Sequence, residues 1–119
     1  MQMTILLKRV YEVANKDDGF RILVDRIWPR GVSKDFADID FWVKDVTPST
    51  TLRKWFSHDP LKWDKFKKDY RAELEKVPDA VDEFVKLLRE HDVVTFLYGA
   101  KDTKHTHAIV LKEYIEGKL

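Results

Sequence analysis

The stretch Val93-Val-Thr-Phe-Leu-Tyr98 decides the fold, because nearly all of its side chains are β-branched or aromatic. Apolar and polar residues do not alternate along it, as they would in a strand with one face in water. An unbroken run of this kind is typical of a parallel strand that is covered on both faces. We therefore expect residues 93–98 to form the central strand of a sheet.

Further strands are predicted nearer the N-terminus, at residues 4–8 and 20–25. A weaker strand is predicted at residues 39–43, because the same residues could also form a helical turn. The connection between the first two strands, residues 10–19, ends in the turn cluster Asn15-Lys-Asp-Asp-Gly19. Its length is compatible with either a hairpin or a crossover.

The middle of the chain carries the signals of helices. Ser49 is a hydroxyl cap for a helix whose apolar residues follow at helical spacing. Asp59-Pro60 is expected to begin the next helix, with a carboxylate cap followed by a residue that needs no N–H partner. The predicted buried face of that helix has apolar residues three or four positions apart: Trp63, Phe66, Tyr70, Leu74 and Val77.

Pro78 separates this helix from another that extends to about His91. A last helix is predicted after the central strand, capped by Asp102 or Thr103 and ending near Gly117. This order of elements predicts an α/β fold: one small domain over residues 1–119, with a mainly parallel β-sheet of about four strands flanked by helices.

Composition excludes several classes of function. The 22 basic and 21 acidic residues give a formal charge of +1, which lacks the excess expected of a protein that mainly coats a phosphate backbone. The absence of cysteine excludes disulfides, thiolate nucleophiles and zinc–thiolate sites. The apolar stretch at residues 1–10 is too short for a signal peptide or a membrane span, so we expect a cytoplasmic protein with no membrane partner.

Polar side chains follow the predicted strands at their carboxyl ends, where ligands bind in open parallel sheets. Asp25 is the candidate carboxylate base or nucleophile, and His105 is the candidate acid or base. The candidate ligand-binding residues are Arg26, Trp28, Arg30, Ser49, Arg53, Tyr98, Lys101 and Asp102. Asp25, Arg26, Arg30, Tyr98, Asp102 and His105 are expected to converge around one concavity.

The loop at residues 25–31, DRIWPRG, is the most unusual stretch. Arg26 and Arg30 could hold a phosphate or a carboxylate, and Trp28 could stack on a base or a sugar. In the alternative interpretation, Trp28 fills the core and Asp25 pairs with one of the two arginines to fix the loop.

His105 and His107 are expected in the first turn of the last helix, where either could contact an anion or exchange a proton. An ordinary capping role for His105 is an equal alternative. No metal site is predicted, because residues two apart on a helix point in different directions and no third His or Cys lies nearby. The sequence specifies no cofactor.

The basic and aromatic residues between Lys62 and Arg71 suggest a nucleic-acid interface. Acidic residues alternate with them, and Lys67 and Lys68 lie within helical reach of Asp64. A solvated, salt-bridged helix face is therefore the favoured interpretation of this stretch.

Several motifs together resemble the YeaO-like branch of the domain-of-unknown-function 488 family. They are GFRILVDRIWPRGVSK at 19–34, WVKDVTPS at 42–49, LRKWF at 52–56, His58-Asp59, and LYGAKD at 97–102 with His105 and Ala108. The resemblance covers nearly the whole chain and implies a small single-domain α/β protein. The family has no assigned reaction, so the resemblance leaves the activity open. The motif residues coincide with the predicted strand-end rim.

Three hypotheses of function follow. The favoured one is a pocket at the carboxyl ends of the strands that binds an anionic small molecule, phosphate-bearing or nucleotide-like, with hydrolase or transferase chemistry as an extension. The second is a nucleic-acid-associated protein that uses the same Arg/Trp loop. The third is a non-catalytic structural or protein-interaction module whose rim residues form an internal polar network. The sequence specifies no oligomeric state.

Overall fold

The computed structural model of the chain describes residues 3–119. It contains a four-stranded sheet in which every neighbouring pair is parallel, in the order β1-β4-β2-β3. The strands are β1 (Thr4–Arg9), β2 (Phe20–Leu23), β3 (Phe41–Trp42) and β4 (Val93–Tyr98). The expected α/β class is confirmed, and the 93–98 segment is a central strand, paired with β1 on one side and β2 on the other.

The connection between β1 and β2 is a crossover, because both strands pair with β4 and not with each other. Its last part is the short 3-10 helix η1 (Lys16–Asp18), capped by Asn15, whose side chain accepts the backbone N–H of Asp17. Gly19 follows with a φ of 66°, and a Cβ there would lie 2.2 Å from the carbonyl oxygen of Val93. Only glycine permits this close approach of the two chain segments.

A buried ionic cluster fixes this end of the sheet. The Asp18 carboxylate pairs with the guanidinium of Arg21 and, at 3.2 Å, with the ammonium of Lys8. Burial by itself would raise the pKa of Asp18. Hydrogen bonds from the Asn15 backbone and from the two cations lower the pKa by more than burial raises it, so the net pKa is below its usual value.

The helices are α1 (Lys34–Ala37), α2 (Thr50–Phe56), α3 (Trp63–Glu75), α4 (Pro78–Leu88) and α5 (His107–Glu116), with the 3-10 turn η2 (Pro60–Lys62) preceding α3. Ser49 caps α2 and Asp59 caps η2, as predicted. The predicted start of α5 is wrong: Thr106 is its N-cap, and its side chain accepts the backbone N–H of Ala108. Asp102 and Thr103 belong to the preceding loop.

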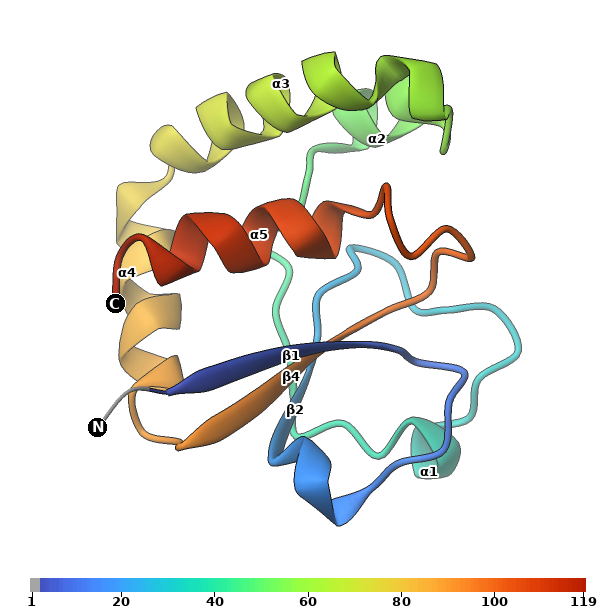
Figure 1. Ribbon diagram of the computed structural model, residues 1–119, viewed down its shortest axis with the longest axis vertical. Helices are drawn as coiled ribbons and strands as arrows, with labels where there is room; N and C mark the ends of the chain where they lie inside the picture. Colours follow the sequence, from blue (N-terminus) through green and yellow to red (C-terminus); the bar gives the residue numbers. More distant parts are fainter. Residues whose placement is uncertain (1–2) are drawn as a thin grey trace.

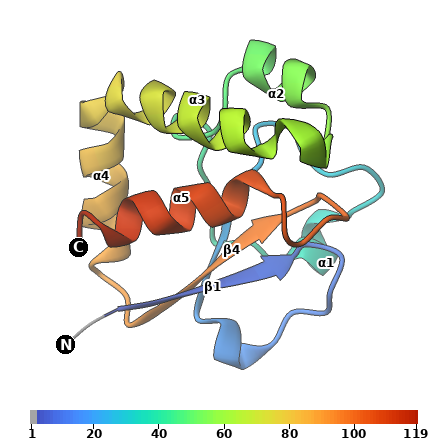
Figure 2. The same ribbon diagram turned by 45° about the horizontal axis from the view of Figure 1, so that its top comes forward.

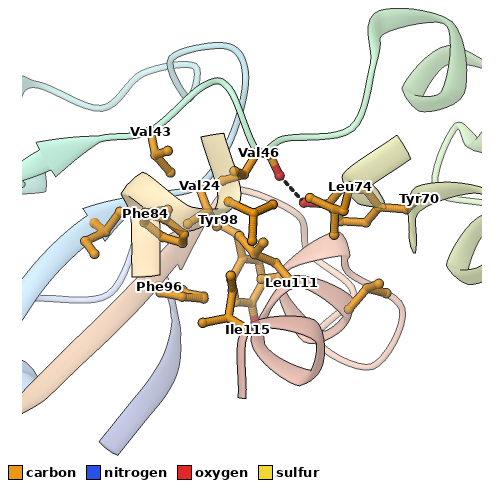
Figure 3. Packing of buried hydrophobic residues seen from close by; sticks show 14 of the residues in the cluster. Val24, Val43, Val46, Tyr70, Leu74, Phe84, Phe96, Tyr98, Leu111 and Ile115 are labelled. Carbon is orange, nitrogen blue, oxygen red and sulfur yellow. Dashed lines mark hydrogen bonds between the residues drawn. The ribbon is translucent and has the colours of Figure 1, made fainter. Parts of the chain in front are cut away.

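The sheet has a hydrophobic core on each face. The larger core lies between the sheet and α2 to α5, and Figure 3 shows Phe96 and Tyr98 of β4 packed in it beside Leu111 and Ile115 of α5. The smaller core contains Leu97 from the opposite face of β4, with Val10, Leu23, Val32 and Ala37. Figure 1 shows α5 and α3 on one side of the strands and α1 on the other. A strand covered on both faces needs the unbroken apolar run that β4 has.

Most of the predicted apolar stripe on α3 is buried. Phe66, Tyr70 and Leu74 are at most 2% exposed, whereas Val77 lies beyond the helix and is 37% exposed. In Figure 2 the arrows of β1 and β4 point the same way, towards the end of the molecule that holds the loop between β4 and α5. No helix within residues 3–119 has the length and apolar character needed to cross a bilayer.

Candidate functional site

A cavity of about 710 Å³ opens at the carboxyl ends of β2 and β4. Its walls come mainly from the loop after β2, from α2 with its flanking residues, and from the loop between β4 and α5. Sites for small molecules typically measure roughly 300 to 1,000 Å³. The cavity therefore has the position and the size of a ligand site in an α/β protein.

Most of the residues predicted from the strand ends line this one cavity. They are Asp25, Arg26, Trp28, Arg30, Arg53, Lys101, Asp102 and His105. The expectation that Asp25 and His105 share a concavity is confirmed, although they are 80 positions apart in the sequence.

Two predicted residues lie elsewhere. The expectation that Tyr98 faces the concavity is wrong, because its side chain points to the same face of β4 as Phe96 and is packed in the larger core. Burial raises the pKa of the Tyr98 phenol. Ser49 lies in a smaller cavity between α2 and α3, where its hydroxyl accepts the N–H of Leu52 and donates to the Glu73 carboxylate at 2.6 Å. Both functions of the Ser49 hydroxyl thus hold α2 in place.

The arginines of the cavity have no carboxylate partner within the described residues. Arg26 donates from Nε to the carbonyl oxygen of Pro48 at 3.0 Å, and Arg30 is exposed. The side chain of Arg53 makes no hydrogen bond within residues 3–119, and its Nε is buried. The interpretation in which Asp25 pairs with an arginine of its loop is therefore wrong. These guanidinium groups remain available to an anion.

Asp25 links the carboxyl ends of β2 and β4 by a hydrogen bond. Its Oδ2 accepts the backbone N–H of Gly99 at 2.8 Å, and its carbonyl oxygen accepts Trp42 Nε1–H at 2.7 Å. Its Oδ1 lies 3.2 Å from Nε2 of His107, which donates to the carbonyl oxygen of Val24 at 2.8 Å. The imidazole next to Asp25 is thus His107, and not His105, which was the candidate acid or base.

His105 is oriented by Asp102 in the loop before α5, and not in the first turn of the helix as expected. Asp102 Oδ1 accepts the backbone N–H groups of Lys104 and His105, and Oδ2 accepts Nδ1–H of His105 at 2.8 Å. The backbone N–H of Lys104 and the His105 imidazole hold the pKa of Asp102 below its usual value. Because Nδ1 of His105 is engaged by Asp102, Nε2 is the ring nitrogen left to contact a ligand.

Trp28 fills the smaller core, as one of its two interpretations expects, and it also borders the cavity. Its Nε1 donates to the carbonyl oxygen of Val32 at 2.7 Å, and its ring packs edge-on against Trp42 at 5.4 Å between centroids. It therefore belongs to the smaller core, as the structural interpretation expects. Part of its side chain also lines the cavity.

An aromatic wall of the cavity, formed by Phe56, Phe66 and His58, was not predicted from the sequence. The rings of Phe56 and Phe66 are stacked, with centroids 4.2 Å apart and an angle of 22° between their planes. Both side chains were interpreted as core residues, which their burial bears out. The available signal was the spacing of Arg53 and Phe56, which puts them on one face of α2.

The basic stretch of α3 is a salt-bridged surface. Lys65 pairs with Asp69 at 2.6 Å, and Lys67 lies 3.8 Å from Asp64.

In residues 3–119, no group of three or more His, Asp or Glu side chains is arranged to hold a metal ion.

Comparison with known proteins adds family relationships. A family model described as "Inactive DUF488-N3 subclade" matches residues 4–119. The chain is 41% identical over 113 residues to "Uncharacterized protein YeaO" of Escherichia coli (strain K12), covering 95% of this chain and 97% of that protein. It is 38% identical over 114 residues to "Uncharacterized protein Rv3073c" of Mycobacterium tuberculosis (strain ATCC 25618 / H37Rv), covering 96% and 95%. No solved structure matches significantly.

Proposed function

Since the chain belongs to the inactive DUF488-N3 subclade, we propose that it binds a small phosphate-bearing anion in the cavity at the carboxyl ends of its strands and does not transform it. The guanidinium groups of Arg26, Arg30 and Arg53 hold the anion in this proposal. Asp25 and His105, the candidate catalytic residues, contribute hydrogen bonds to the ligand.

The observation that carries the proposal is Nε of Arg53, a buried donor without a hydrogen-bond partner in the wall of the cavity. A buried donor normally has a partner, and leaving it without one costs stability. The fold provides such a partner for Arg21, which pairs with Asp18. A ligand anion would supply the same kind of partner to Arg53.

The charge of the lining supports an anion over a cation. The cavity is lined by four basic side chains, Arg26, Arg30, Arg53 and Lys101, and by two carboxylates, Asp25 and Asp102. Both carboxylates already accept hydrogen bonds from backbone N–H groups of the β4–α5 loop. The four basic side chains outnumber the two carboxylates, and this positive excess favours an anion, while Oδ1 of Asp25 is buried without a hydrogen-bond partner and can accept a hydrogen bond from the same ligand.

Binding without turnover is supported by the description of the family as inactive and by the bonding of Asp25. Oδ2 of that carboxylate accepts the Gly99 N–H and has a structural role, whereas Oδ1 has no hydrogen-bond partner and is the oxygen that contacts a ligand in this proposal. A hydrolase or transferase that uses Asp25 and His105 is the alternative. It predicts release of inorganic phosphate from a phosphate ester.

The test is calorimetric titration with inorganic phosphate, ribose 5-phosphate and ribose. We expect both phosphates to bind and ribose not to bind. Arg53→Gln should weaken phosphate binding by about 10- to 100-fold, since it removes a charge-assisted pair. Lys54→Gln is the matched control, because Lys54 is the exposed neighbour on α2 and does not line the cavity.

The melting temperature of Arg53→Gln should stay close to that of the wild type, while its stabilisation by added phosphate is lost. Equal weakening by Arg53→Gln and Lys54→Gln would contradict the proposed site. Release of phosphate from ribose 5-phosphate, abolished by Asp25→Asn, would establish the catalytic alternative.

A further inference from the structure

We infer that the ligand is a hydroxylated phosphate ester, the phosphate of a polyol or a sugar, with its phosphate at the arginines and a hydroxyl group that donates to Asp25. This inference rests on the proposed function, because it specifies the remainder of the same anionic ligand. It assigns to Asp25 the discrimination between phosphate esters that carry a hydroxyl group and those that do not.

Two side-chain atoms within residues 3–119 are buried without a hydrogen-bond partner, and both belong to residues that line this cavity. They are of opposite kinds: Nε of Arg53 is a donor, and Oδ1 of Asp25 is an acceptor. Buried polar atoms in folded proteins are nearly always paired, so each of the two indicates a group that the protein itself does not supply. An anion satisfies only the arginine. A ligand that satisfies both must carry an acceptor and a donor.

The neighbours of Asp25 hold its carboxylate in place and leave Oδ1 unpaired. Oδ2 accepts the backbone N–H of Gly99 at 2.8 Å. Nε2 of His107 is 3.2 Å from Oδ1, but its hydrogen bond is made to the carbonyl oxygen of Val24, at 2.8 Å. The Asp25 side chain as a whole is 18% exposed and forms part of the cavity wall. The protein therefore fixes the orientation of the carboxylate and leaves the hydrogen bond to Oδ1 to a ligand.

The chemistry of the cavity favours a hydroxyl group as the donor to Oδ1 of Asp25. An ionised phosphate or sulfate oxygen has no hydrogen to donate and is repelled by a carboxylate. An ammonium group would donate, but the four basic side chains of the lining outnumber the two carboxylates and repel a further positive charge. A hydroxyl group donates a hydrogen bond without adding charge.

His105 offers a contact for a second hydroxyl group. Its Nδ1 is engaged by Asp102 at 2.8 Å, so Nε2 is the ring nitrogen left to contact a ligand. A hydroxyl group both donates and accepts, so it matches Nε2 in either protonation state of the ring. Asp25 and His105 lie in the two loops that follow β2 and β4, and both line the cavity. Polyols and sugars carry several hydroxyl groups on neighbouring carbons, as two such contacts require.

The size and the apolar lining of the cavity favour an ester over a bare anion. Its volume of about 710 Å³ is within the range of roughly 300 to 1,000 Å³ that is typical of sites for whole organic ligands. Ile27, Pro29 and Ala100 add apolar surface to the lining. The carbon skeleton of a polyol or a sugar can cover this surface, whereas inorganic phosphate would leave it in contact with water.

The experiment is calorimetric titration of the wild-type protein with glycerol 3-phosphate, propyl phosphate, inorganic phosphate and phosphoethanolamine. The first two have the same number of carbons and differ in their hydroxyl groups. At about pH 8, well above the second pKa of about 6 of a phosphate ester, both are doubly charged. We expect glycerol 3-phosphate to bind about 10- to 100-fold more tightly than propyl phosphate, because a hydrogen bond to a charged group contributes on this scale.

Asp25→Asn tests the role of the carboxylate. The amide can still accept the Gly99 N–H, but it places an NH₂ donor where Oδ1 was, opposite the hydroxyl group of the ligand. The preference for glycerol 3-phosphate should therefore fall towards unity. Propyl phosphate should bind at least as tightly as to the wild type, because a negative charge has been removed. Asp45→Asn is the matched control: it removes an exposed carboxylate outside the cavity and should leave the preference unchanged.

The outcomes separate this inference from the proposed function. Equal binding of glycerol 3-phosphate and propyl phosphate to the wild type, with both weakened by Arg53→Gln, would overturn the hydroxylated ligand and leave the proposed function standing. Failure of every phosphate to bind would overturn both. A wild-type preference that Asp25→Asn retains would overturn the role of Asp25. The comparison on the wild-type protein tests the ligand class whether or not Asp25→Asn folds.

The other two probes identify a different donor. Inorganic phosphate keeps a proton of its own at pH 8, so binding as tight as that of glycerol 3-phosphate would overturn the hydroxyl group in favour of this proton. Phosphoethanolamine carries an ammonium group in place of hydroxyl groups, and tighter binding of this probe would overturn the inference in favour of an amine.

Discussion

The hydroxyl of Tyr70 is expected to be a major contributor to the stability of the site's scaffold. Tyr70 is fully buried on α3, and its hydroxyl donates to the carbonyl oxygen of Val46, the bond drawn in Figure 3. Val46 belongs to the segment that connects β3 to α2, and α2 carries Arg53. Burial raises the pKa of the Tyr70 phenol well above its usual value, so the hydroxyl remains a donor throughout the accessible pH range.

Tyr70→Phe removes the donor without creating a large cavity, and it leaves the Val46 carbonyl buried with one partner fewer. Val46 is 1% exposed, so water does not readily replace the lost donor. The expected loss is about 1 to 3 kcal/mol in the free energy of unfolding. For 119 residues this corresponds to a fall in melting temperature of roughly 4 to 12 °C.

The assay is urea unfolding followed by tryptophan fluorescence, with Tyr98→Phe as the matched control. Tyr98 is also in the core, at 4% exposed, but its hydroxyl makes no hydrogen bond within residues 3–119. Its removal should therefore cost less than about 0.5 kcal/mol. Equal losses in the two variants, at an unchanged dependence on urea, would refute the assignment of stability to the Tyr70–Val46 bond.

Two further predictions concern the opposite end of the sheet. The pKa of Asp18 is lowered in the folded protein, so its contribution to stability is present above about pH 4 and is lost as the pH falls through the folded pKa. In urea unfolding at several pH values, Asp18→Asn should remove most of this loss of stability at low pH. At neutral pH it should cost about 3 to 5 kcal/mol, because Arg21 stays buried without its carboxylate partner. The same loss of stability at low pH in the variant as in the wild type would disprove the assignment to Asp18. Gly19→Ala should cost more than roughly 2 kcal/mol, since its Cβ would lie 2.2 Å from the Val93 carbonyl oxygen. Gly31→Ala is the control, with a φ of 76° and open space around the new Cβ, and a smaller loss of about 1 kcal/mol is expected in thermal unfolding.

The sequence predicted the parts of the fold that depend on local chemistry. The composition of residues 93–98 was sufficient to put β4 inside the sheet, and the hydroxyl of Ser49 was sufficient to begin α2. Parallel strands then brought Asp25 and His105 to one rim, because the carboxyl ends of such strands lie together. The cavity was predictable for this reason without any knowledge of its shape.

The start of α5 was not predictable in this way. Asp102, Thr103 and Thr106 all have side chains that cap helices, and only tertiary contacts distinguish them. A start at His107 lets its imidazole donate to the carbonyl oxygen of Val24 at the end of β2. That contact joins residues 83 positions apart, and no local propensity encodes it.

The aromatic wall was missed because a buried ring gives the same sequence pattern whether it faces other side chains or a cavity. Phe56 and Phe66 have the periodicity of core residues and also pack as core residues. Tyr98 is the opposite case: it was expected at the cavity and lies in the core. Successive side chains of β4 point to opposite faces of the sheet, and this places Tyr98 on the same face as Phe96.

The strand order has a consequence for the protein during its synthesis. β4 lies between β1 and β2, and Thr4 pairs with Val93, so β1 has no partner in the sheet, and β2 pairs only with the two-residue β3, until residues 93–98 have left the ribosome. At the usual rates of translation β1 therefore waits for several seconds unpaired. The nascent chain is therefore expected to need shielding from aggregation until its last quarter is made, and a ribosome-bound fragment ending before β4 should be degraded by proteases that spare the full-length protein.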